Sequence, residues 1–347
     1  VKGAEIAQKR DSSMEVVLIG PKVDSTLKQV VVESEDAGYR KMEELLDSGK
    51  INCCVTMHYS FPIGVSTVGK VVTPGKGNEM FLATTTGTSS PQRVEAMIKN
   101  GIYGIITAKA MGIKNPTVGI LNVDGARQVE RALKELCGNG YDINLTESLR
   151  ADGGCVMRGN DLLAGTPDVM ITDTLTGNLL MKVFSSFTTG GDYESLGYGY
   201  GPGIGEGYER TILILSRASG VPVVANAIIY GASLAKGNLK KVAEEEFEMA
   251  NKAGLKEILK GLSKEAKKAD DDEEVAPPPK EVVTGTIAGI DIMELENAVM
   301  ILWKNGIYAE SGMGCTGPIL MVNEGKLEKA KEILEKENYI SREKPIC

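Results

Sequence analysis

The sequence predicts a two-lobed α/β protein in which mostly parallel sheets carry helices on both faces. Short apolar runs alternate with amphipathic helical stretches along the 347 residues, an order typical of parallel sheets covered by helices. The chain holds 41 glycines but only 5% aromatic residues, which suits many tight strand-to-helix turns. Its length exceeds what one compact core usually holds, which favours two domains.

The individual elements follow from apolar runs and helical spacing. Strands are expected at residues 14–20, 81–84, 117–122, 168–172, 221–225 and 319–322. Helices are expected at residues 1–10 and 37–46, from residue 91 onward, and around residues 255–262, where four apolar side chains recur at helical spacing. Since an α/β chain normally places a strand before its first helix, we expect a strand to precede residue 1 in the complete protein.

The domain boundaries are expected around one unusual segment. Residues 1–115 together with 286–347 are predicted to form the first lobe, and residues 116–262 the second. Residues 263–285 combine an acidic run with three consecutive prolines and are predicted to be a linker or insert. A solvated spacer and an arm that docks a partner both fit this composition.

Charge and cysteine content exclude several classes of function. Lys and Arg number 39 and Asp and Glu 47, so the net charge of −8 offers no general attraction for nucleic acid or an anionic membrane. No apolar run approaches the ~20 residues of a membrane helix, and there is no signal-peptide pattern, so a cytoplasmic location is expected. Six irregularly spaced cysteines and a single histidine favour free thiols, with no metal and no other cofactor.

Two segments of the chain share one pattern. Residues 95–125 and 296–325 both contain Lys-Asn-Gly-Ile-Tyr after a helical stretch, then a Met-Gly-x-x-x-Pro turn and a strand. The pattern predicts a related structural unit, although α/β units also share such helix-ending and turn residues by chance. In the second copy Cys315 stands where the first has Ile113.

This contrast makes Cys315 the candidate nucleophile. A thiol exposed on a glycine-rich turn can accept an acyl group, and the backbone N–H groups of Gly314, Thr316 and Gly317 are candidates to stabilise the developing oxyanion. A free thiol needs a nearby cation or helix N-terminus to ionise at neutral pH. A buried structural cysteine is the alternative.

A second constellation predicts an anion site. An apolar strand ends at Asp173, and a helix is expected to begin near Asn178. Because strand ends that face helix N-termini bind anions in α/β sheets, Thr176, Gly177 and Asn178 are candidate ligands of phosphate or of the acyl group. Asp173 would orient donors, and Lys182 lies one helical turn after Asn178. An ordinary capped turn is the alternative.

Two further segments invite a functional interpretation. Residues 190–207 are rich in glycine and tyrosine but match G-x-G-x-x-G poorly, so we reject dinucleotide binding and expect a mobile lid or a loop that contacts a partner. Residues 84–90, which run into Arg93, form a second candidate anion pocket at a helix start, although such Ser/Thr clusters usually only cap helices.

These motifs together resemble a known family. The order ITDTLTGNLLMK, GYGYGPGIGEGYER, the acidic-proline segment and GMGCTGP is similar, over essentially the whole chain, to the alpha subunits of protein C of the glycine/sarcosine/betaine reductase complex. More remotely, the segment from Asp173 to Asn178 resembles phosphate acyltransferases and phosphotransacetylases. Residues 215–220 are only faintly similar to the segment that carries the phosphotransacetylase Ser/Asp pair, so those catalytic roles are not transferred.

The resemblance implies a fold of the isocitrate/isopropylmalate dehydrogenase type and a reaction. An acetyl group would pass from selenoprotein A of the complex to Cys315, and inorganic phosphate, a substrate and not a cofactor, would release it as acetyl phosphate. The beta subunit of protein C is the other implied partner. Two alternatives remain: direct transfer to phosphate without an enzyme thioester, and a non-catalytic subunit that docks partners.

Overall fold

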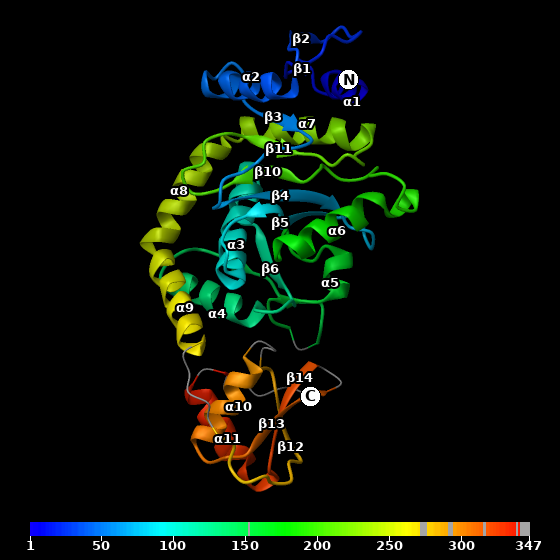
Figure 1. Ribbon diagram of the computed structural model, residues 1–347. Coiled ribbons are helices and arrows are strands. Elements are labelled where there is room, and N and C mark those ends of the chain that lie inside the picture. Colours follow the sequence, from blue (N-terminus) through cyan, green and yellow to red (C-terminus); the bar gives the residue numbers. More distant parts are fainter. Residues whose placement is uncertain (152, 271–275, 291–293, 315–316, 338, 341–347) are drawn as a thin grey trace. The chain divides into compact units, whose positions relative to one another are not determined.

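A computed structural model describes the chain apart from residues 152, 271–275, 291–293, 315–316, 338 and 341–347 (Figure 1). Its contacts divide the chain into two compact units. Residues 1–122 and 132–255 form the first unit, and residues 123–131 and 256–347 form the second.

A nine-stranded sheet forms the centre of the first unit. Its path is β3-β11-β10-β4-β5-β9-β6-β7, with β8 paired to β6. The pairings of β3 with β11, β5 with β9, and β6 with β7, β8 and β9 are parallel, whereas β10 and β4 pair antiparallel with their neighbours. The predicted α/β class with a mostly parallel sheet is therefore confirmed. In chain order the strands are β3 (Cys54–Thr56), β4 (Val65–Val72), β5 (Glu79–Thr88), β6 (Thr117–Leu121), β7 (Asn144–Leu145), β8 (Val156–Met157), β9 (Val169–Ile171), β10 (Gly201–Ile204) and β11 (Ile212–Ile214).

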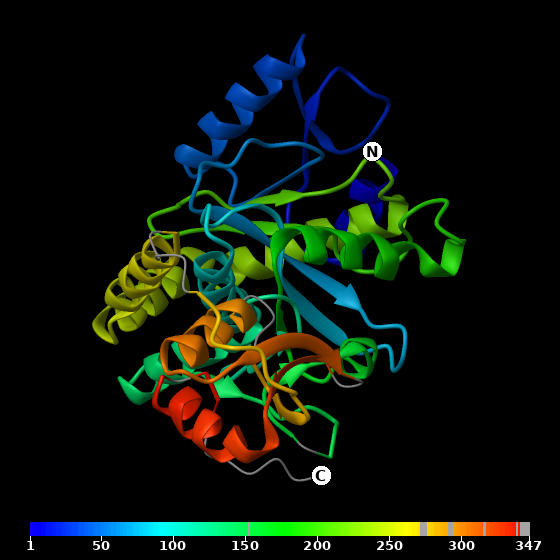
Figure 2. The same ribbon diagram turned by 60° about the horizontal axis from the view of Figure 1, so that its bottom comes forward.

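Helices cover both faces of this sheet. A Cβ on Gly104 of helix α3 would lie 3.0 Å from the Cβ of Ala83, and one on Gly69 would lie 2.3 Å from Met181 Cε of helix α6. Gly69 pairs with Leu82, the neighbour of Ala83, and adjacent side chains point to opposite faces, so α3 and α6 lie on opposite sides. Figure 2 shows α6 in green beside the long strands β4 and β5. The longer helices are α3 (Arg93–Ala110), α4 (Ala126–Gly138), α6 (Thr174–Ser186), α7 (Val221–Lys236), α8 (Leu239–Lys252) and α9 (Leu255–Asp270), and α5 (Gly159–Ala164) is short.

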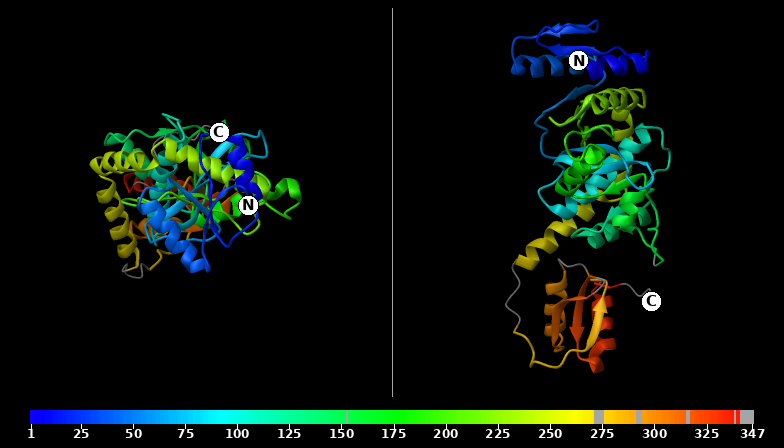
Figure 3. Two further views of the ribbon diagram at one scale, coloured as in Figure 1. Left: turned by 90° about the horizontal axis from the view of Figure 1, so that it is seen from above. Right: turned by 90° about the vertical axis from the view of Figure 1, so that its right-hand side faces the viewer.

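The N-terminal segment packs on the outer helix α7 (Figure 3). Gly3 lets α1 approach Val224 so closely that a Cβ there would lie 2.7 Å from it, and Arg10 donates a 3.0 Å hydrogen bond to Asn226. The predicted first two helices are confirmed. The elements of this segment are α1 (Lys2–Arg10), β1 (Val17–Gly20), its parallel partner β2 (Lys28–Val31) and α2 (Glu35–Asp47).

The second unit contains an antiparallel sheet of order β12-β14-β13 with two helices packed on it. Side chains from all five elements share one apolar core, which includes Leu302 and Leu320. The elements are β12 (Gly285–Ala288), α10 (Leu295–Lys304), β13 (Ala309–Gly314), β14 (Gly317–Val322) and α11 (Leu327–Lys336).

The expected lobe boundaries differ from this division. Residues 116–262 were assigned to a separate lobe, whereas β6, β9, β10 and β11 join the same sheet as β4 and β5. Helix α9 also continues to Asp270, into the segment 263–285 that was predicted to be a linker or insert. Local composition identified the polar segment, but the strand pairings that join distant parts of the chain are not visible in it.

The repeated pattern does not form a repeated structure. In the first copy Asn100 and Gly101 lie buried inside α3, where Gly101 packs so closely on Ile171 that a Cβ would approach its Cδ1 to 2.7 Å. In the second copy α10 ends at Lys304, and Gly306 follows with a left-handed φ of +73°. The prediction of a related unit is therefore wrong, and Cys315 itself lies outside the described residues.

Two other sequence predictions are wrong, one because of the length of an apolar run and the other because of burial. Residues 221–225 begin helix α7, because the apolar run continues with small residues to Lys236, too long for a strand. The glycine-rich segment is no lid over its second half, since Gly201–Ile204 is the buried strand β10 inside the sheet. Glycine is required there because a Cβ on Gly201 would lie 1.7 Å from the carbonyl oxygen of Val68.

Candidate functional site

The first turn of α6 follows strand β9 directly. Asp173 caps the helix by accepting hydrogen bonds from the backbone N–H of Thr176 at 3.0 Å and from its hydroxyl at 2.6 Å. Helix α6 consequently begins at Thr174, four residues before the start expected near Asn178. The cap places the candidate ligand residues inside the first turn of the helix.

Two of the candidate ligands, Gly177 and Asn178, contact β5, and a third, Thr176, bonds to the helix cap. The amide of Asn178 donates to the carbonyl oxygen of Thr85 at 2.9 Å, and both donors of Thr176 are directed to Asp173. A Cβ on Gly177 would lie only 1.9 Å from the carbonyl oxygen of Thr84, so only glycine permits this approach. Thr176 and Asn178 thus spend on the cap and on β5 the side-chain donors that were expected to meet a ligand.

The second predicted anion segment meets the first at this place. Arg93, the first residue of α3, lies with its Nη2 3.0 Å from Oδ2 of Asp173. The hydroxyls of Thr84 and Thr174 lie 3.1 Å apart. Two segments that were recognised separately in the sequence therefore form one site at the carboxyl ends of the parallel strands β5 and β9.

The electrostatics of this site keep Asp173 ionised. Burial opposes the ionisation of Asp173, but its hydrogen bonds with Thr176 and the charge of Arg93 outweigh burial and hold the pKa of Asp173 below its ordinary value. A helix N-terminus adds partial positive charge and N–H groups that have no partner within the helix. Arg93 is 44% exposed, so its guanidinium can be reached from solvent.

Lys182, one helical turn after Asn178 in α6, belongs to a second polar network. Its ammonium lies 3.1 Å from the hydroxyl of Tyr200, which donates to the buried carboxylate of Glu194 at 2.7 Å. Ser219 donates to the second oxygen of Glu194 at 2.6 Å. The network joins α6, the glycine- and tyrosine-rich segment and the turn at residues 215–220.

Sequence reasoning missed Glu194 and Ser219. A carboxylate inside a stretch dominated by glycine, serine, threonine and aromatic residues is the signal that could have identified Glu194, because such a group must be paired when it is buried. Burial, followed by its hydrogen bond to Glu194, raises the pKa of Tyr200 well above its ordinary value, so the phenol stays protonated and remains a donor.

The thiol expected to carry the acyl group cannot be placed in this geometry. Strand β13 ends at Gly314 and β14 begins at Gly317, and these two residues pair in the antiparallel sheet. Cys315 and Thr316, which join them in the sequence, lie outside the described residues. The roles predicted for Cys315 and its neighbours therefore stay predictions.

Two of the other cysteines are poor nucleophiles. Burial raises the pKa of Cys53 to about 11, and burial together with the neighbouring Cys53 raises that of Cys54 to about 12. Cys155 is buried, and Cys137 is partly buried with its thiol 3.6 Å from the carbonyl oxygen of Ile143. Within the described part of the chain, no cluster of three or more His, Cys, Asp or Glu residues could hold a metal ion.

Comparison with known proteins assigns the family. The profile of the family described as "Fatty acid synthesis protein" matches residues 1–321. The alpha subunit of component C of the glycine/sarcosine/betaine reductase complex from Peptoclostridium acidaminophilum is 69% identical over 96% of this chain and 87% of its own length. The chain belongs to the family described as "Fatty acid synthesis protein", together with this reductase subunit.

More distant similarities are to proteins named as acyl-transfer enzymes. A phosphate acyltransferase from Lysinibacillus sphaericus is 26% identical over 44% of the chain and 49% of its own length, and one from Thermotoga maritima is 26% identical over 52% and 63%. A branched-chain phosphotransacylase structure from Enterococcus faecalis V583 has 16% identity and a TM-score of 0.48, covering 67% of this chain and 94% of that one. Among the described residues, no helix is long and apolar enough to cross a membrane.

Proposed function

We propose that this chain transfers an acyl group to inorganic phosphate, which binds at the N-terminus of α6 beside Arg93. The observation that carries the proposal is the ion pair of Arg93 with the helix-capping Asp173, which holds a guanidinium next to the first turn of α6. Helix N-termini at the carboxyl edge of a parallel sheet bind phosphate groups. Relatives named phosphate acyltransferase support the same reaction class.

The residues of the site divide into ligands and supports. Arg93 and the backbone N–H groups of Thr174 and Leu175, the first two residues of α6, are the proposed phosphate ligands, and Lys182, held by Tyr200, is the second cation. Asp173 orients Arg93, and the contacts of Gly177 and Asn178 with β5 fix the position of the helix. A bidentate guanidinium suits the geometry of phosphate oxygens.

The proposed acyl carrier is the thiol of Cys315. Its thiolate attacks the carbonyl carbon of an acetyl thioester on the donor, and the donor leaves as a thiolate. A phosphate oxygen then attacks the Cys315 thioester, the new C–O bond forms, and the C–S bond breaks to release acetyl phosphate and the Cys315 thiolate. The N–H groups of Gly314, Thr316 and Gly317 are proposed to stabilise the oxyanion in both steps.

The proposed setting is a reductase complex in the cytoplasm. The relative that is 69% identical over 96% of the chain is named as the alpha subunit of component C of the glycine/sarcosine/betaine reductase complex. The proposed partners are accordingly the beta subunit of that component and selenoprotein A as the acetyl donor. No nucleic acid, membrane or metal takes part in the proposed reaction.

Labelling with acetyl phosphate tests the thioester. The protein is incubated with radiolabelled acetyl phosphate, digested at acidic pH to preserve thioesters, and the labelled peptide is sequenced. We expect the label on the peptide that contains Cys315, its loss in Cys315→Ala, and its retention in the control variant Cys137→Ala. Label that persists in Cys315→Ala would exclude this thiol as the carrier.

A second measurement separates the proposal from its alternatives. A thioester enzyme exchanges labelled phosphate into acetyl phosphate without any other acceptor, because acylation by acetyl phosphate is the reverse of the release step. Direct transfer to phosphate needs both substrates in a ternary complex and gives no such exchange by the enzyme alone. Absence of both exchange and transfer in the presence of the partner subunits would indicate a non-catalytic docking role.

A further inference from the structure

One polar side chain inside helix α3 is completely buried. Asn100 is 0% exposed, and the fully buried residues Met97, Ile98 and Ile102 before and after it are apolar. Asn is a poorer helix former than Leu, and a buried amide needs hydrogen-bond partners to offset its lost hydration. Helix stability and apolar packing would therefore favour an apolar residue at this position, so neither of them accounts for the amide.

The Asn100 amide connects α3 to three other segments. Its Nδ2 donates a hydrogen bond of 3.0 Å to the backbone carbonyl oxygen of Thr172, which directly follows β9. Its Oδ1 accepts one of 2.7 Å from the hydroxyl of Ser89 and a longer one of 3.4 Å from the hydroxyl of Ser66 in β4. Because all four residues are buried, these bonds are stronger than they would be in water.

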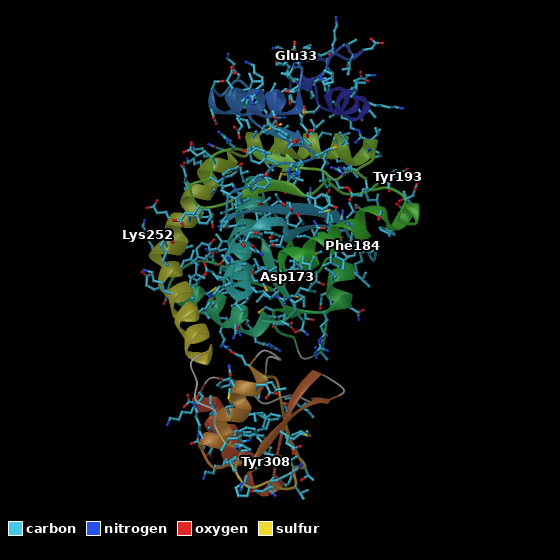
Figure 4. The ribbon with its side chains drawn as sticks, in the orientation of Figure 1. Glu33, Asp173, Phe184, Tyr193, Lys252 and Tyr308 are labelled. Carbon is cyan, nitrogen blue, oxygen red and sulfur yellow. The ribbon has the colours of Figure 1, made fainter. Side chains whose placement is uncertain are left out.

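Two of these partners adjoin the candidate anion site. Thr172 immediately precedes Asp173, the cap of α6 that is labelled in Figure 4, and Ser89 lies four residues before Arg93. Residues seven apart lie on the same side of a helix, so Asn100 and Arg93 share the side of α3 that contacts the chain after β9. The amide thus fixes the backbone beside both members of the Arg93–Asp173 ion pair.

The side chain of Asn100 has no exposed surface, so it can act on a ligand only through other residues. We propose that Asn100 is a positioning residue that holds Arg93 and Asp173 in the arrangement that binds phosphate. This role rests on the proposed function of the site. Groups that bind a substrate need supporting hydrogen bonds, because a small displacement of such a group can reduce a rate by up to about 100-fold.

A purely structural role for the amide is the alternative, and the two roles differ in what they change. Loss of a structural amide lowers the stability of the fold and leaves the kinetic constants of the folded protein as they were. Loss of a positioning amide raises the Michaelis constant for phosphate and weakens phosphate binding in the folded protein.

The test compares two fully buried positions of α3. Asn100→Leu removes the amide with little change in volume, and Thr107→Val removes a hydroxyl that donates at 2.8 Å to the carbonyl oxygen of Tyr103 in the same helix. In the exchange of labelled phosphate into acetyl phosphate, Asn100→Leu should raise the Michaelis constant for phosphate about tenfold, comparable with the loss of one hydrogen bond. Thr107→Val should leave that constant unchanged.

Chemical modification measures phosphate binding without turnover. Phenylglyoxal modifies arginine side chains, and Arg93 is 44% exposed, so mass spectrometry can follow its modification. Inorganic phosphate should protect Arg93 in the wild type and in Thr107→Val, whereas Asn100→Leu should need about tenfold more phosphate for the same protection. Arg127, which is 48% exposed and pairs with Glu130, is the internal reference that phosphate should not protect.

Two further variants keep the role of Asn100 testable if Asn100→Leu does not fold. Ser89→Ala removes one hydrogen bond of the amide and should raise the Michaelis constant for phosphate about threefold. The double variant Ser89→Ala/Arg93→Ala should have the same constant as Arg93→Ala alone, because the amide acts through Arg93.

The outcomes separate the role of Asn100 from the phosphate site itself. A wild-type Arg93 that phosphate does not protect would exclude the proposed phosphate site, and with it the role of Asn100. Protection in the wild type that neither Asn100→Leu nor Ser89→Ala weakens would overturn the role of Asn100 and leave the phosphate site in place. Reduced stability in Asn100→Leu with an unchanged Michaelis constant would assign the amide to folding alone and would also overturn it.

Discussion

The guanidinium of Arg93 lies 3.0 Å from the carboxylate of Asp173, across 80 residues of sequence. Arg93 begins helix α3 on one face of the sheet, and Asp173 caps helix α6 on the other. Their ion pair bridges two helix N-termini at the carboxyl ends of parallel strands. The same carboxylate therefore caps one helix and orients a cation beside its first turn.

Replacing Arg93 tests its proposed contact with phosphate. Arg93→Ala should raise the Michaelis constant for phosphate in the exchange reaction about 10- to 100-fold, because a hydrogen bond to a charged group contributes about 1.5–3 kcal/mol. Arg127→Ala is the matched control, since Arg127 is 48% exposed and pairs with Glu130 much as the 44% exposed Arg93 pairs with Asp173. Equal Michaelis constants for phosphate in Arg93→Ala and Arg127→Ala would show that Arg93 does not bind phosphate.

Acid should abolish the stabilising effect of Asp173. Its pKa in the folded protein is lowered from 3.8, so the ionised carboxylate stabilises the fold above that value and the effect is lost as the pH falls through the folded-state pKa. Asp173→Ala should therefore cost about 1 kcal/mol at neutral pH and progressively less in acid. Urea unfolding from neutral to acidic pH measures this difference in unfolding free energy, and Asp192→Ala, at an exposed position, is the control. A difference that grows in acid would contradict the prediction.

A methyl group on Gly177 should destabilise the fold. Its Cβ would lie 1.9 Å from the carbonyl oxygen of Thr84, so α6 must move away from β5 at a cost of about 2–3 kcal/mol. Gly138→Ala in α4 is the control, because no atom lies within 4 Å of the added Cβ. That variant should be neutral or stabilised by up to about 1 kcal/mol. Chemical denaturation compares the two, and equal stabilities would show that the close approach is not tight.

The phenol of Tyr200 should matter for activity more than that of Tyr198. Both hydroxyls bond to carboxylates, Tyr200 to Glu194 and Tyr198 to Glu79, but only Tyr200 contacts Lys182. Tyr200→Phe should reduce the phosphate exchange rate about tenfold, the effect of one lost hydrogen bond that positions a cation, whereas Tyr198→Phe should reduce it much less. A similar loss in both would point to a general effect of the segment on folding.

The partly buried thiols of Cys53 and Cys54 should stay largely unmodified in the native protein. With pKa values of about 11 and 12, Cys53 and Cys54 hold almost no thiolate at neutral pH. A thiol reagent should modify them only after denaturant unfolds the chain, which mass spectrometry of the modified peptides can show. Rapid native labelling of either residue would contradict their burial and make them competitors for the acyl group.

Much of the local structure could be predicted because short-range patterns decide it. The expected helices at residues 37–46 and 255–262 and the strands at 117–122 and 319–322 correspond to α2, α9, β6 and β14. Apolar spacing identifies such elements without knowledge of their neighbours. The same patterns identified both polar segments that meet at the candidate site, since a strand followed by Ser, Thr or Asp is visible in the sequence.

The tertiary structure alone decided how those segments are used. The letters Lys-Asn-Gly-Ile-Tyr form the interior of α3 at residues 99–103, where Asn100 bonds to the carbonyl oxygen of Thr172 at 3.0 Å, but follow the end of α10 at residues 304–308. In strand β10 a Cβ on Gly201 would lie 1.7 Å from the carbonyl oxygen of Val68, and one on Gly203 would lie 2.4 Å from the ring of Phe61.

The sequence by itself determined the α/β class, the polar segments and the family, because these depend on residue types and their order. Only the folded chain showed that Thr176 and Asn178 support the helix, and that Arg93 meets Asp173. The physical reason is that a hydrogen-bond donor has no assigned partner until the chain brings distant groups together. Which donors remain for a ligand is therefore a property of the packing and not of the motif.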